Sequence, residues 1–331
     1  MSAGCFESPE DFVVEELPAY EPQGEGEHTF LWIEKRLRNT DDVARELARA
    51  AGVAPRDVGY AGRKDRFAVA RQHFSVPGLS VAAALGLRLE GARVLRACAH
   101  RHKLRTGHLV GNRFELRVHG SSPESAARSE RVRAGLAAVG LPNRFGEQRF
   151  GRGGDNVERG RRLLSGERLK VDRRQARFLV SALQAAVFNE VLRARSLRLD
   201  EVEAGDLACR TDSGGIFRVE DVAVENQRAQ RFEISATGPI FGTRVETPAG
   251  AVGVREQAAM AAFGLDSEHL RAPKGVRMRG ARRPLRVPVH NLFLAHEGDT
   301  LHLRFELPAG SFATVLLEEL LGGLPRVSSP P

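Results

Sequence analysis

The stretch GNRFELRV, residues 111–118, alternates without interruption between side chains of two kinds. The apolar positions are Phe114, Leu116 and Val118, and the charged positions between them are Arg113, Glu115 and Arg117. Successive side chains of a β-strand point to opposite faces, so this pattern predicts a strand with one buried and one solvated face. LHLRFEL, residues 301–307, repeats the pattern and predicts a second half-buried strand.

Other elements are indicated by periodicity and by the residues at their ends. TFLWIEK, residues 29–35, predicts a strand, and a helix is expected from Asp41 to Ala51, with Asn39 and Thr40 as capping candidates and Gly52 as its stop. Further helices are expected over 123–140, 173–195 and 312–321, the last capped by Ser311 and stopped at Gly322. The glycine-rich stretch 143–156 predicts a loop and a candidate domain boundary.

The composition is that of a globular chain with about two domains. Its 331 residues are 42% hydrophobic and 28% charged, and a domain commonly holds about 100–200 residues. No run of about 18 apolar residues occurs, so we expect neither a transmembrane helix nor a membrane partner. The acidic start, MSAGCFESPEDFVVEE, is unlike a signal peptide, and a cytoplasmic protein is therefore expected.

The charge and the metal-binding residue types bear on partners. A net charge of +8 with a pI near 10.1 favours a polyanionic partner, although arginine enrichment from genome composition explains it as well. Cys5, Cys98 and Cys209 are odd in number and far apart, which predicts neither a disulfide framework nor a zinc site. His100 and His102 lie among cations in AHRHKLR, which favours a solvated basic face over a metal site.

One local feature points to chemistry. In GYAGRKDRFAVARQ, residues 59–72, Asp65 lies between Lys64 and Arg66, with Arg63 one residue further away. Neighbouring cations favour the ionised carboxylate, which would keep Asp65 nucleophilic at neutral pH. The alternative is a solvated turn in which Asp65 pairs with its neighbours, and spacing alone favours that alternative.

The chain resembles the TruD family of tRNA pseudouridine synthases. Six blocks match the family in the right order: PEDFVVEE at 9–16, GEGEHTFLWIEKRLRNT at 24–40, GYAGRKDRFAVARQ at 59–72, HKLRTGHLVGNRFEL at 102–116, LPNRFGEQRFG at 141–151 and LPAGSFATVLLEEL at 307–320. Any one block could be a chance match, but six in order are highly specific. The segment beyond about residue 200 resembles the family only weakly.

The resemblance implies an isomerisation of uridine within folded tRNA. The bond between ribose and uracil N1 breaks, the base turns, and it is rejoined through C5, so no cofactor is required. An aspartate attacks either ribose C1′ or uracil C6, and the sequence does not choose between them. The target base must first leave its stack and be held by stacking and by hydrogen bonds to its edge.

Carried over residue by residue, the resemblance assigns a site. It assigns the nucleophile to Asp65, recognition of the uracil edge to Asn112, pocket walls to Phe12, Phe114 and Phe312, and supporting roles to Glu16 and Lys64. Asn112 and Phe114 are two apart on one strand and hence on one face. Each phenylalanine has a structural alternative, since Phe114 continues the buried stripe and Phe312 could belong to the core face of the last helix. The family often carries a lysine at the position of Phe6, which puts a basic contact in doubt.

The predicted architecture is α+β with two domains. A mixed, mainly antiparallel sheet with flanking helices is expected from residues 1–150 and 284–331 as a discontinuous catalytic domain, and the resemblance identifies 151–283 as the family's insertion domain. The family's substrate is a D-arm uridine of tRNA, at position 13. We expect tRNA as the partner and predict no metal and no protein partner.

Two other classes of function stay open at this point. A non-catalytic tRNA-binding or tRNA-folding protein on the same scaffold would bind without isomerisation. A nucleoside or glycoside hydrolase also attacks an anomeric carbon, but it commonly uses paired carboxylates, and GRKDR offers one. Release of free uracil would distinguish the hydrolase.

Overall fold

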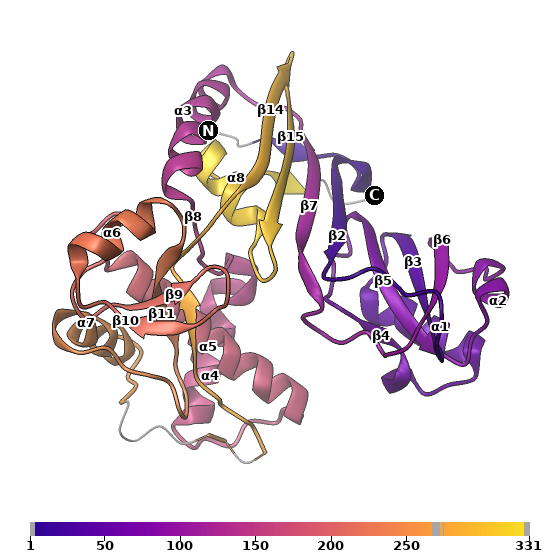
Figure 1. Cartoon of the computed structure of the whole chain (residues 1–331), viewed down its shortest axis with the longest axis horizontal. Coiled ribbons are helices and arrows are strands. Elements are labelled where there is room, and N and C mark those ends of the chain that lie inside the picture. Colours follow the sequence, from indigo (N-terminus) through magenta and orange to yellow (C-terminus); the bar gives the residue numbers. More distant parts are fainter. Residues whose placement is uncertain (1–3, 267–271, 274, 328–331) are drawn as a thin grey trace. The chain divides into compact units, whose positions relative to one another are not determined.

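A computed structural model describes residues 4–266, 272–273 and 275–327 (Figure 1). The chain separates into two compact units that are each described by themselves. Unit 1 comprises Met1–Arg133, Val289–Ala313 and Leu317–Pro331, and unit 2 comprises Ala134–Pro288 and Thr314–Leu316. That these units correspond to a catalytic and an insertion domain stays a prediction.

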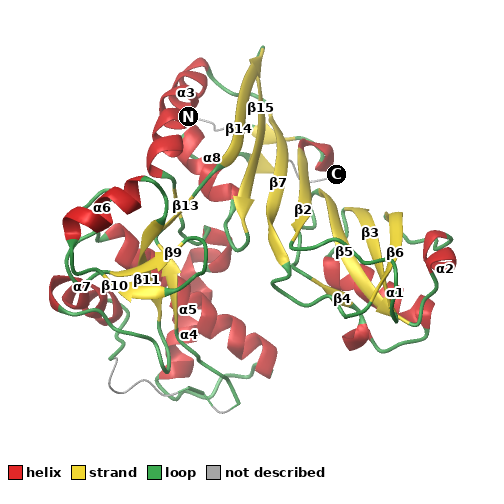
Figure 2. Cartoon of the chain, in the orientation of Figure 1, coloured by secondary structure: helices red, strands yellow, loops and turns green. Residues whose placement is uncertain are grey.

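Unit 1 is built on an eight-stranded sheet (Figure 2). Its strands are β2 (Phe12–Pro18), β3 (His28–Arg36), β4 (Gly59–Tyr60), β5 (Val69–Pro77), β6 (Ala92–His100), β7 (Leu109–Val118), β14 (His290–Glu297) and β15 (Thr300–Pro308). The order is β14-β15-β7-β2-β5-β3-β6, with β4 paired to β5. All neighbours are antiparallel except β2 and β5. The predicted α+β class with a mixed, mainly antiparallel sheet is confirmed.

The two alternating stretches form neighbouring strands of this sheet. β7 and β15 are antiparallel, with Phe114 opposite Phe305 and Leu116 opposite Leu303. All four side chains are buried, whereas Glu115, between the two β7 residues, is exposed. Cross-strand pairs of large apolar side chains stabilise a sheet, and here they turn one face into core. The prediction of half-buried strands is confirmed.

Four helices and one short pair of strands belong wholly or partly to unit 1. The helices are α1 (Thr40–Ala51), α2 (Val81–Leu85), α3 (Pro123–Val139) and α8 (Ala313–Leu321), and β1 (Cys5–Phe6) pairs in parallel with β16 (Arg326–Val327). Short 3₁₀ turns cover Pro9–Asp11 and Pro55–Asp57. α1 follows Asn39 directly and ends at Gly52, whose φ of 66° is left-handed and suits glycine. Its residues Val43 and Leu47 are fully buried against β3 and β5.

The start of α8 differs from the prediction. Phe312 is the residue before its first turn, and it makes no side-chain cap bond. Ser311 lies in the turn after β15, where its backbone N–H donates to the carbonyl of Pro308 at 3.2 Å. The Ser311 hydroxyl is buried and has no hydrogen-bond partner among the residues that the structure describes. The predicted cap at Ser311 is therefore wrong, while the stop at Gly322, with a φ of 76°, is confirmed.

The opposite face of the sheet carries a row of charges. Ion pairs run without interruption across six neighbouring strands, through Arg93, Glu34, Arg71, Glu15, Arg113 and Glu306. The N–O distances along the row lie between 2.8 and 3.4 Å. Each exposed pair contributes at most about 1 kcal/mol, but alternation of sign matches each strand to its neighbour.

Unit 2 contains a smaller four-stranded sheet with helices. The strands, in the order β10-β9-β11-β12, are β10 (Ile216–Arg218), β9 (Leu207–Arg210), β11 (Ile234–Ile240) and β12 (Ala281–Pro284), and β8 (Leu141–Pro142) pairs with β13 (Arg286–Val287). The helices are α4 (Asp155–Leu164), α5 (Arg173–Arg193), α6 (Val222–Gln230) and α7 (Gly250–Ala261). Short 3₁₀ turns at Glu147–Arg149 and Arg152–Gly154 interrupt the predicted loop, and α5 matches the helix expected over 173–195.

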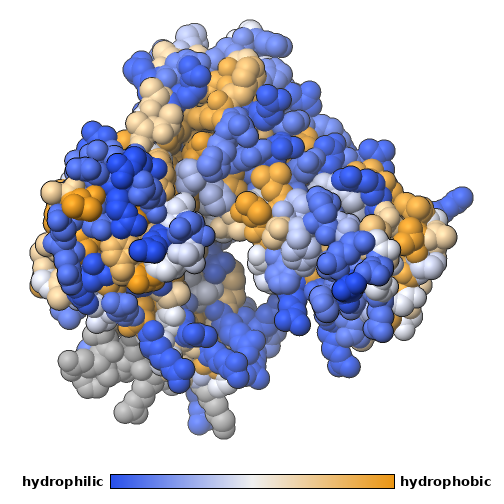
Figure 3. Space-filling view, viewed as in Figure 1, coloured by the Kyte–Doolittle hydropathy of each residue, from blue (hydrophilic) through white to orange (hydrophobic). Residues whose placement is uncertain are grey.

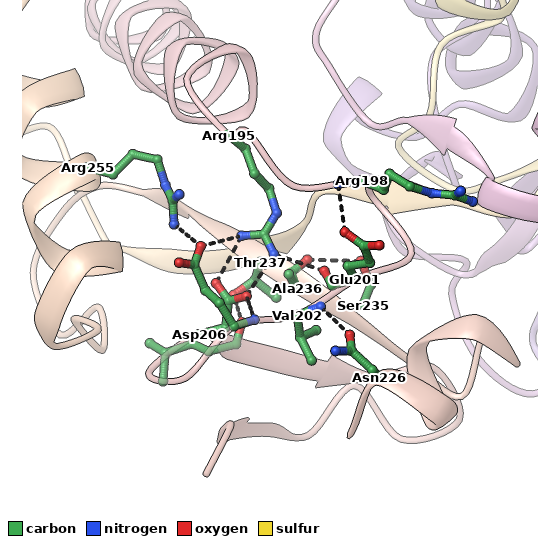
Figure 4. Close-up of polar contacts among 12 residues, drawn as sticks. Arg195, Arg198, Glu201, Val202, Asp206, Asn226, Ser235, Ala236, Thr237 and Arg255 are labelled. Carbon is green, nitrogen blue, oxygen red and sulfur yellow. Dashed lines mark hydrogen bonds and ion pairs between the residues drawn. The ribbon is translucent and has the colours of Figure 1, made fainter. Parts of the chain in front are cut away.

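A buried ion cluster lies at the end of α5 in unit 2 (Figure 4). The Arg195 guanidinium donates to both carboxylate oxygens of Asp206, at 2.8 and 3.1 Å, and a third donor to Asp206 is the backbone N–H of Glu203 at 3.0 Å. The side chains of Arg195 and Asp206 are 3% and 1% exposed. Arg255, from α7, pairs with the Glu203 carboxylate. We call Arg195, Glu203, Asp206 and Arg255 the arginine cluster.

The surface in view is mostly hydrophilic, with scattered apolar spots (Figure 3). None of the helices in the described ranges is long and apolar enough to cross a membrane. Within the same ranges, His, Cys, Asp and Glu side chains form no group of three that could hold a metal ion.

Candidate active site

Asp65 lies in the loop that joins β4 to β5. β4 pairs with β5 through Gly59 and Tyr60, so the loop leaves the sheet and returns to it at Val69. The Asp65 residue is exposed to solvent. Its carboxylate has no hydrogen-bond or ion-pair partner within residues 4–266, 272–273 and 275–327. The loop therefore presents an unpaired carboxylate, which is what a nucleophile requires.

The cations beside Asp65 in the sequence do not pair with it. Arg63 binds Asp41 at 3.2 Å, Lys64 binds Glu16 at 3.0 Å, and Arg66 donates to the carbonyl of Leu37 at 3.3 Å. The alternative of a turn in which Asp65 pairs with its neighbours is not observed.

The electrostatics of Asp65 also differ from the prediction. Desolvation raises the pKa of the Asp65 carboxyl above its ordinary value, and the positive charges of Lys35 and Lys64 oppose that rise. Water still reaches the exposed residue and limits the rise. The prediction named Lys64 among the cations that favour the ionised form, but it missed Lys35, thirty residues away in the sequence, and the desolvation that outweighs both.

Glu16 and Lys64 form a buried ion pair that ties the loop to β2. Their side chains are 1% and 5% exposed. Glu16 also accepts a hydrogen bond from the backbone N–H of His73 at 3.1 Å. Burial alone raises the pKa of Glu16, but contacts with His73 and Lys64 outweigh it and hold the pKa below its ordinary value. The pair thus fixes the backbone of Lys64, directly before Asp65.

Asn112 lies on β7 opposite Glu16 on β2 and opposite Leu307 on β15. Its side-chain oxygen is buried and has no partner in the described part of the chain. A buried polar atom without a partner costs about 1–3 kcal/mol, so such an atom needs an explanation, and one explanation is a ligand. Through Glu16 and Lys64, the structure brings Asn112 to the same region of unit 1 as Asp65.

The predicted aromatic residues lie at the end of the apolar stripe. The rings of Phe12 and Phe114 are 6.2 Å apart and nearly perpendicular, and Phe114 stacks on Phe305 at 5.1 Å. Phe12 and Phe114 are only 8% and 6% exposed, so most of each ring is core. Phe6, at the position where the resembling family often has a lysine, packs edge-on against Phe12 at 5.5 Å. The side chain at position 6 is therefore not a cation but a further ring of the aromatic cluster that contains Phe12 and Phe114.

Phe312 lies in the short segment between β15 and α8. It is half-buried and extended, with φ of −117° and ψ of 122°. β15 ends at Pro308, one residue after Leu307, which faces Asn112. The roles predicted for Phe12, Phe114 and Phe312 as pocket walls stay predictions.

Sequence reasoning missed three residues that lie beneath the loop of Asp65. They are Lys35 of β3, Thr40 at the start of α1, and Gln72 of β5, and each is at most 2% exposed. The signal for Lys35 was present: it lies two residues from Ile33, on the face of the strand that is otherwise apolar. A buried lysine is rare unless it is paired, so it marks a polar site within the core.

The histidine pair in AHRHKLR departs from the prediction. His100 is only 5% exposed. Its ring lies 4.4 Å from that of Phe30 and stacks on Tyr20 at 5.4 Å. Desolvation lowers the pKa of His100 below its ordinary value. His100 is thus part of an aromatic cluster, and only His102 matches the predicted solvated face.

Known proteins that are similar to this chain indicate its family. The model of the family described as tRNA pseudouridine synthase D (TruD) matches residues 6–170 and 164–320, which together include every residue of the candidate site. The chain belongs to the TruD family.

TruD relatives cover nearly the whole chain. Proteins named tRNA pseudouridine synthase D from Geobacter metallireducens and Thermus thermophilus are 40% and 43% identical to it. The first alignment spans 96% of this chain and 94% of the relative, and the second 95% and 87%. A solved structure of a Methanosarcina mazei protein assigned to TruD aligns with a TM-score of 0.76 over 98% of this chain and 94% of that one. At 21% identity this last likeness shows the fold.

Proposed function

We propose that this chain isomerises a uridine of folded tRNA to pseudouridine, with Asp65 as the nucleophile. The observation that carries the proposal is the Asp65 carboxylate, which is exposed and unpaired while the cations around it bind other groups. Membership of the TruD family and the names of its relatives support the reaction. Resemblance to the family supports the D-arm uridine at position 13 as the target.

The reaction needs one attacking carboxylate and no redox partner. Attack on ribose C1′ breaks the bond to N1 and releases uracil as an anion that the site must hold. Attack on uracil C6 instead gives an adduct whose N1–C1′ bond then breaks. In both routes the base turns and C5 bonds to C1′; this step displaces the Asp65 ester in the first route, and in the second the bond from Asp65 to C6 breaks as the C5 proton leaves. The C5 proton passes to solvent, and N1, freed from C1′, takes up a proton in its place. Substrate and product are isomers, so no atom is gained or lost.

Asn112 is suited to hold the turned base. Uracil presents an N3–H donor between two carbonyl acceptors, and an amide side chain carries one acceptor and one donor group. The buried, unpaired oxygen of Asn112 supplies the acceptor that N3–H requires. Such a site discriminates strongly between bases, because a base without an N3–H donor leaves the buried Asn112 oxygen unpaired.

The flipped base also requires apolar surface. Unstacking it from the RNA costs a few kcal/mol, which stacking on a protein ring offsets by about 1–3 kcal/mol per base. Phe12, Phe114 and Phe312 are the rings proposed to provide it. Phe12 and Phe114 are held by neighbouring rings at 5.1–6.2 Å, so little conformational freedom is left to lose on binding.

The test is to map pseudouridine in unmodified tRNA transcripts after incubation with the protein. The parent should convert one D-arm uridine, and Asp65→Ala should convert none while it binds the same tRNA. Asp57→Asn, which removes another carboxylate shortly before β4, is the matched control and should keep parental activity. Substantial conversion by Asp65→Ala would show that Asp65 is not the nucleophile. A parent that binds tRNA without converting it would support the binding protein, and free uracil the hydrolase.

A further inference from the structure

The loop of Asp65 rests on three buried polar side chains. Lys35 and Gln72 are fully buried, and Thr40 is 2% exposed. Two of them come from neighbouring strands of the sheet and the third from the first turn of α1. Burying uncompensated polar groups opposes folding, so their partners explain why they are there.

Lys35 binds backbone carbonyls only. Its ammonium donates to the carbonyl of Asp65 at 2.8 Å, to that of Arg38 at 2.7 Å and, at 3.4 Å, to that of Lys64. Three donors and three acceptors are thus matched. The carbonyl of Asp65 is attached to the same α-carbon as its side chain, so this contact restrains the backbone from which the carboxylate projects.

Thr40 and Gln72 hold the preceding residues of the loop. The Thr40 hydroxyl accepts from the backbone N–H of Lys64 at 3.0 Å and donates to the Gln72 side-chain oxygen at 2.9 Å. The Gln72 amide donates to the carbonyl of Gly62 at 2.9 Å. Together with Lys35, these contacts fix backbone groups from Gly62 to Asp65.

The supporting strands are themselves rigid. Lys35 faces Ala70, and Ile33 faces Gln72, in a register of nine paired residues between β3 and β5. β3 is also paired with β6 on its other edge. A side chain on a central strand is held more precisely than one on a loop. Lys35 is such a side chain, and its hydrogen bonds restrain the loop of Asp65.

We infer that Lys35 is a positioning residue for the Asp65 carboxylate, holding the loop backbone so that the carboxylate meets the flipped nucleotide in one orientation. This inference rests on the proposed function and goes beyond it, since Lys35 contacts neither the carboxylate nor the substrate. Misplacement of a reacting group by about 1 Å costs a reaction on the order of 10²-fold in rate.

The first test is Lys35→Met, which keeps the length and removes the donors. At saturating enzyme, the single-turnover rate of isomerisation should fall by about 10–10² fold, while the dissociation constant for the same tRNA transcript stays within about twofold. Leu47→Ala is the control, because Leu47 is buried in the core between α1 and the same strands and contacts nothing in the loop through hydrogen bonds. It should unfold more readily than the parent but convert at the parental rate once folded.

The second readout is the pH dependence of the rate. Desolvation lowers the pKa of Lys35 to about 8, Asp65 raises it, and Lys64 lowers it further; these are the charged groups that act on it. As the pH rises through about 8, the ammonium loses its charge and its hold on the carbonyls weakens. The ratio of the parental rate to that of Lys35→Met should therefore narrow above pH 8, and a purely structural lysine would leave that ratio constant.

Each outcome decides the inference. Parental rates in Lys35→Met, a loss of tRNA affinity in place of rate, or an equal loss of rate in folded Leu47→Ala would overturn it. If Lys35→Met does not fold, Thr40→Val tests the same support by removing the contact with Lys64 at constant size, and a folded Thr40→Val with parental rate overturns the inference as well. A parent without isomerase activity would instead refute the proposed function.

Discussion

Two groups of charges in this molecule are built on opposite plans. In the arginine cluster of unit 2, Asp206 binds Arg195 through both oxygens and a backbone N–H besides. Beneath the loop of unit 1, Lys35 and Lys64 are also satisfied, yet Asp65, the carboxylate on which both charges act, is left without a partner among the described residues. Asp206 is thus fully paired, as a structural carboxylate is expected to be, whereas Asp65 is left unpaired beside satisfied cations, as the proposed nucleophile requires.

The comparison also explains why the cations near Asp65 are bound to other groups. A free ammonium next to a free carboxylate would pair with it and lower its reactivity. Lys35 is engaged by carbonyls and Lys64 by Glu16, so their charges act on Asp65 without a direct bond. Their field favours the ionised carboxylate against the crowding that disfavours it.

The largest effect should come from breaking the arginine cluster. Asp206→Asn leaves the Arg195 guanidinium buried with only its longer ion pair to Glu203, at 3.5 Å, and the loss of one partner of a buried ion pair costs about 3–5 kcal/mol of unfolding free energy. Urea unfolding followed by circular dichroism measures it. Asp212→Asn, at an exposed aspartate of the same unit, is the control and should change stability by less than about 0.5 kcal/mol. Equal stability of the two variants would mean that the arginine cluster does not support unit 2.

A smaller loss is expected from the ion pair of unit 1. Glu16→Gln leaves Lys64 buried beside a neutral amide, at a cost of about 1–3 kcal/mol near neutral pH. The folded-state pKa of Glu16 is depressed, so its stabilisation is present above the unfolded pKa of about 4.3 and is lost as the pH falls through the folded value. The difference in stability between parent and variant should therefore shrink below pH 4. A difference that is constant from pH 7 to pH 3 contradicts this account.

Asn112→Ala should act on the reaction more than on the fold. The Asn112 side-chain oxygen has no partner within the described chain. Truncation therefore removes an unpaired buried oxygen and should cost less than about 1 kcal/mol of unfolding free energy. Single-turnover isomerisation should slow by roughly tenfold or more, because the edge of the base loses its acceptor. Melting curves and rates are measured on one preparation. An unchanged rate would remove Asn112 from the site.

The smallest effect on stability belongs to Asp65 itself. Its pKa is raised in the folded protein, so its charge opposes folding at neutral pH and is neutralised in both states only below the unfolded pKa of about 3.9. Asp65→Asn should therefore be as stable as the parent or slightly more stable at pH 7, within about 0.5 kcal/mol. Any difference should vanish in acid. A clear loss of stability at pH 7 would mean that Asp65 is a structural residue.

Local patterns in the sequence predict much of unit 1. The alternation around Phe114 depends only on which side chains are apolar, and it survives in the sheet unchanged. The helix ending at Gly52 is likewise set by residues within one turn. Failures occur where a contact outside the element itself decides. Ser311 precedes a helix in the sequence, but a turn bound to Pro308 moves the start of α8 past it.

The site shows the same limit. Asp65 and Asn112 are named by motif, but nothing near them in the sequence reveals that Lys35 binds the carbonyl of Asp65 or that Lys64 turns away to Glu16. Those contacts depend on β2, β3 and β5 being neighbours, which is long-range information. His100 illustrates this too, because its burial by Tyr20 and Phe30 depends on a loop and a strand far away along the chain.

The place of β15 inside the sheet of unit 1 has a consequence for how the protein is made. The segment that carries Asp65 and β7 leaves the ribosome before β15, which covers the edge of β7 and lies about 180 residues further along the chain. At about 5–20 residues per second, the nascent chain spends roughly 10–40 s with that edge unpaired. Translation therefore passes through a stage at which Asp65 and β7 have been made but the strand that pairs with β7 has not, and a chain truncated before residue 300 should be captured by chaperones that bind exposed strand edges.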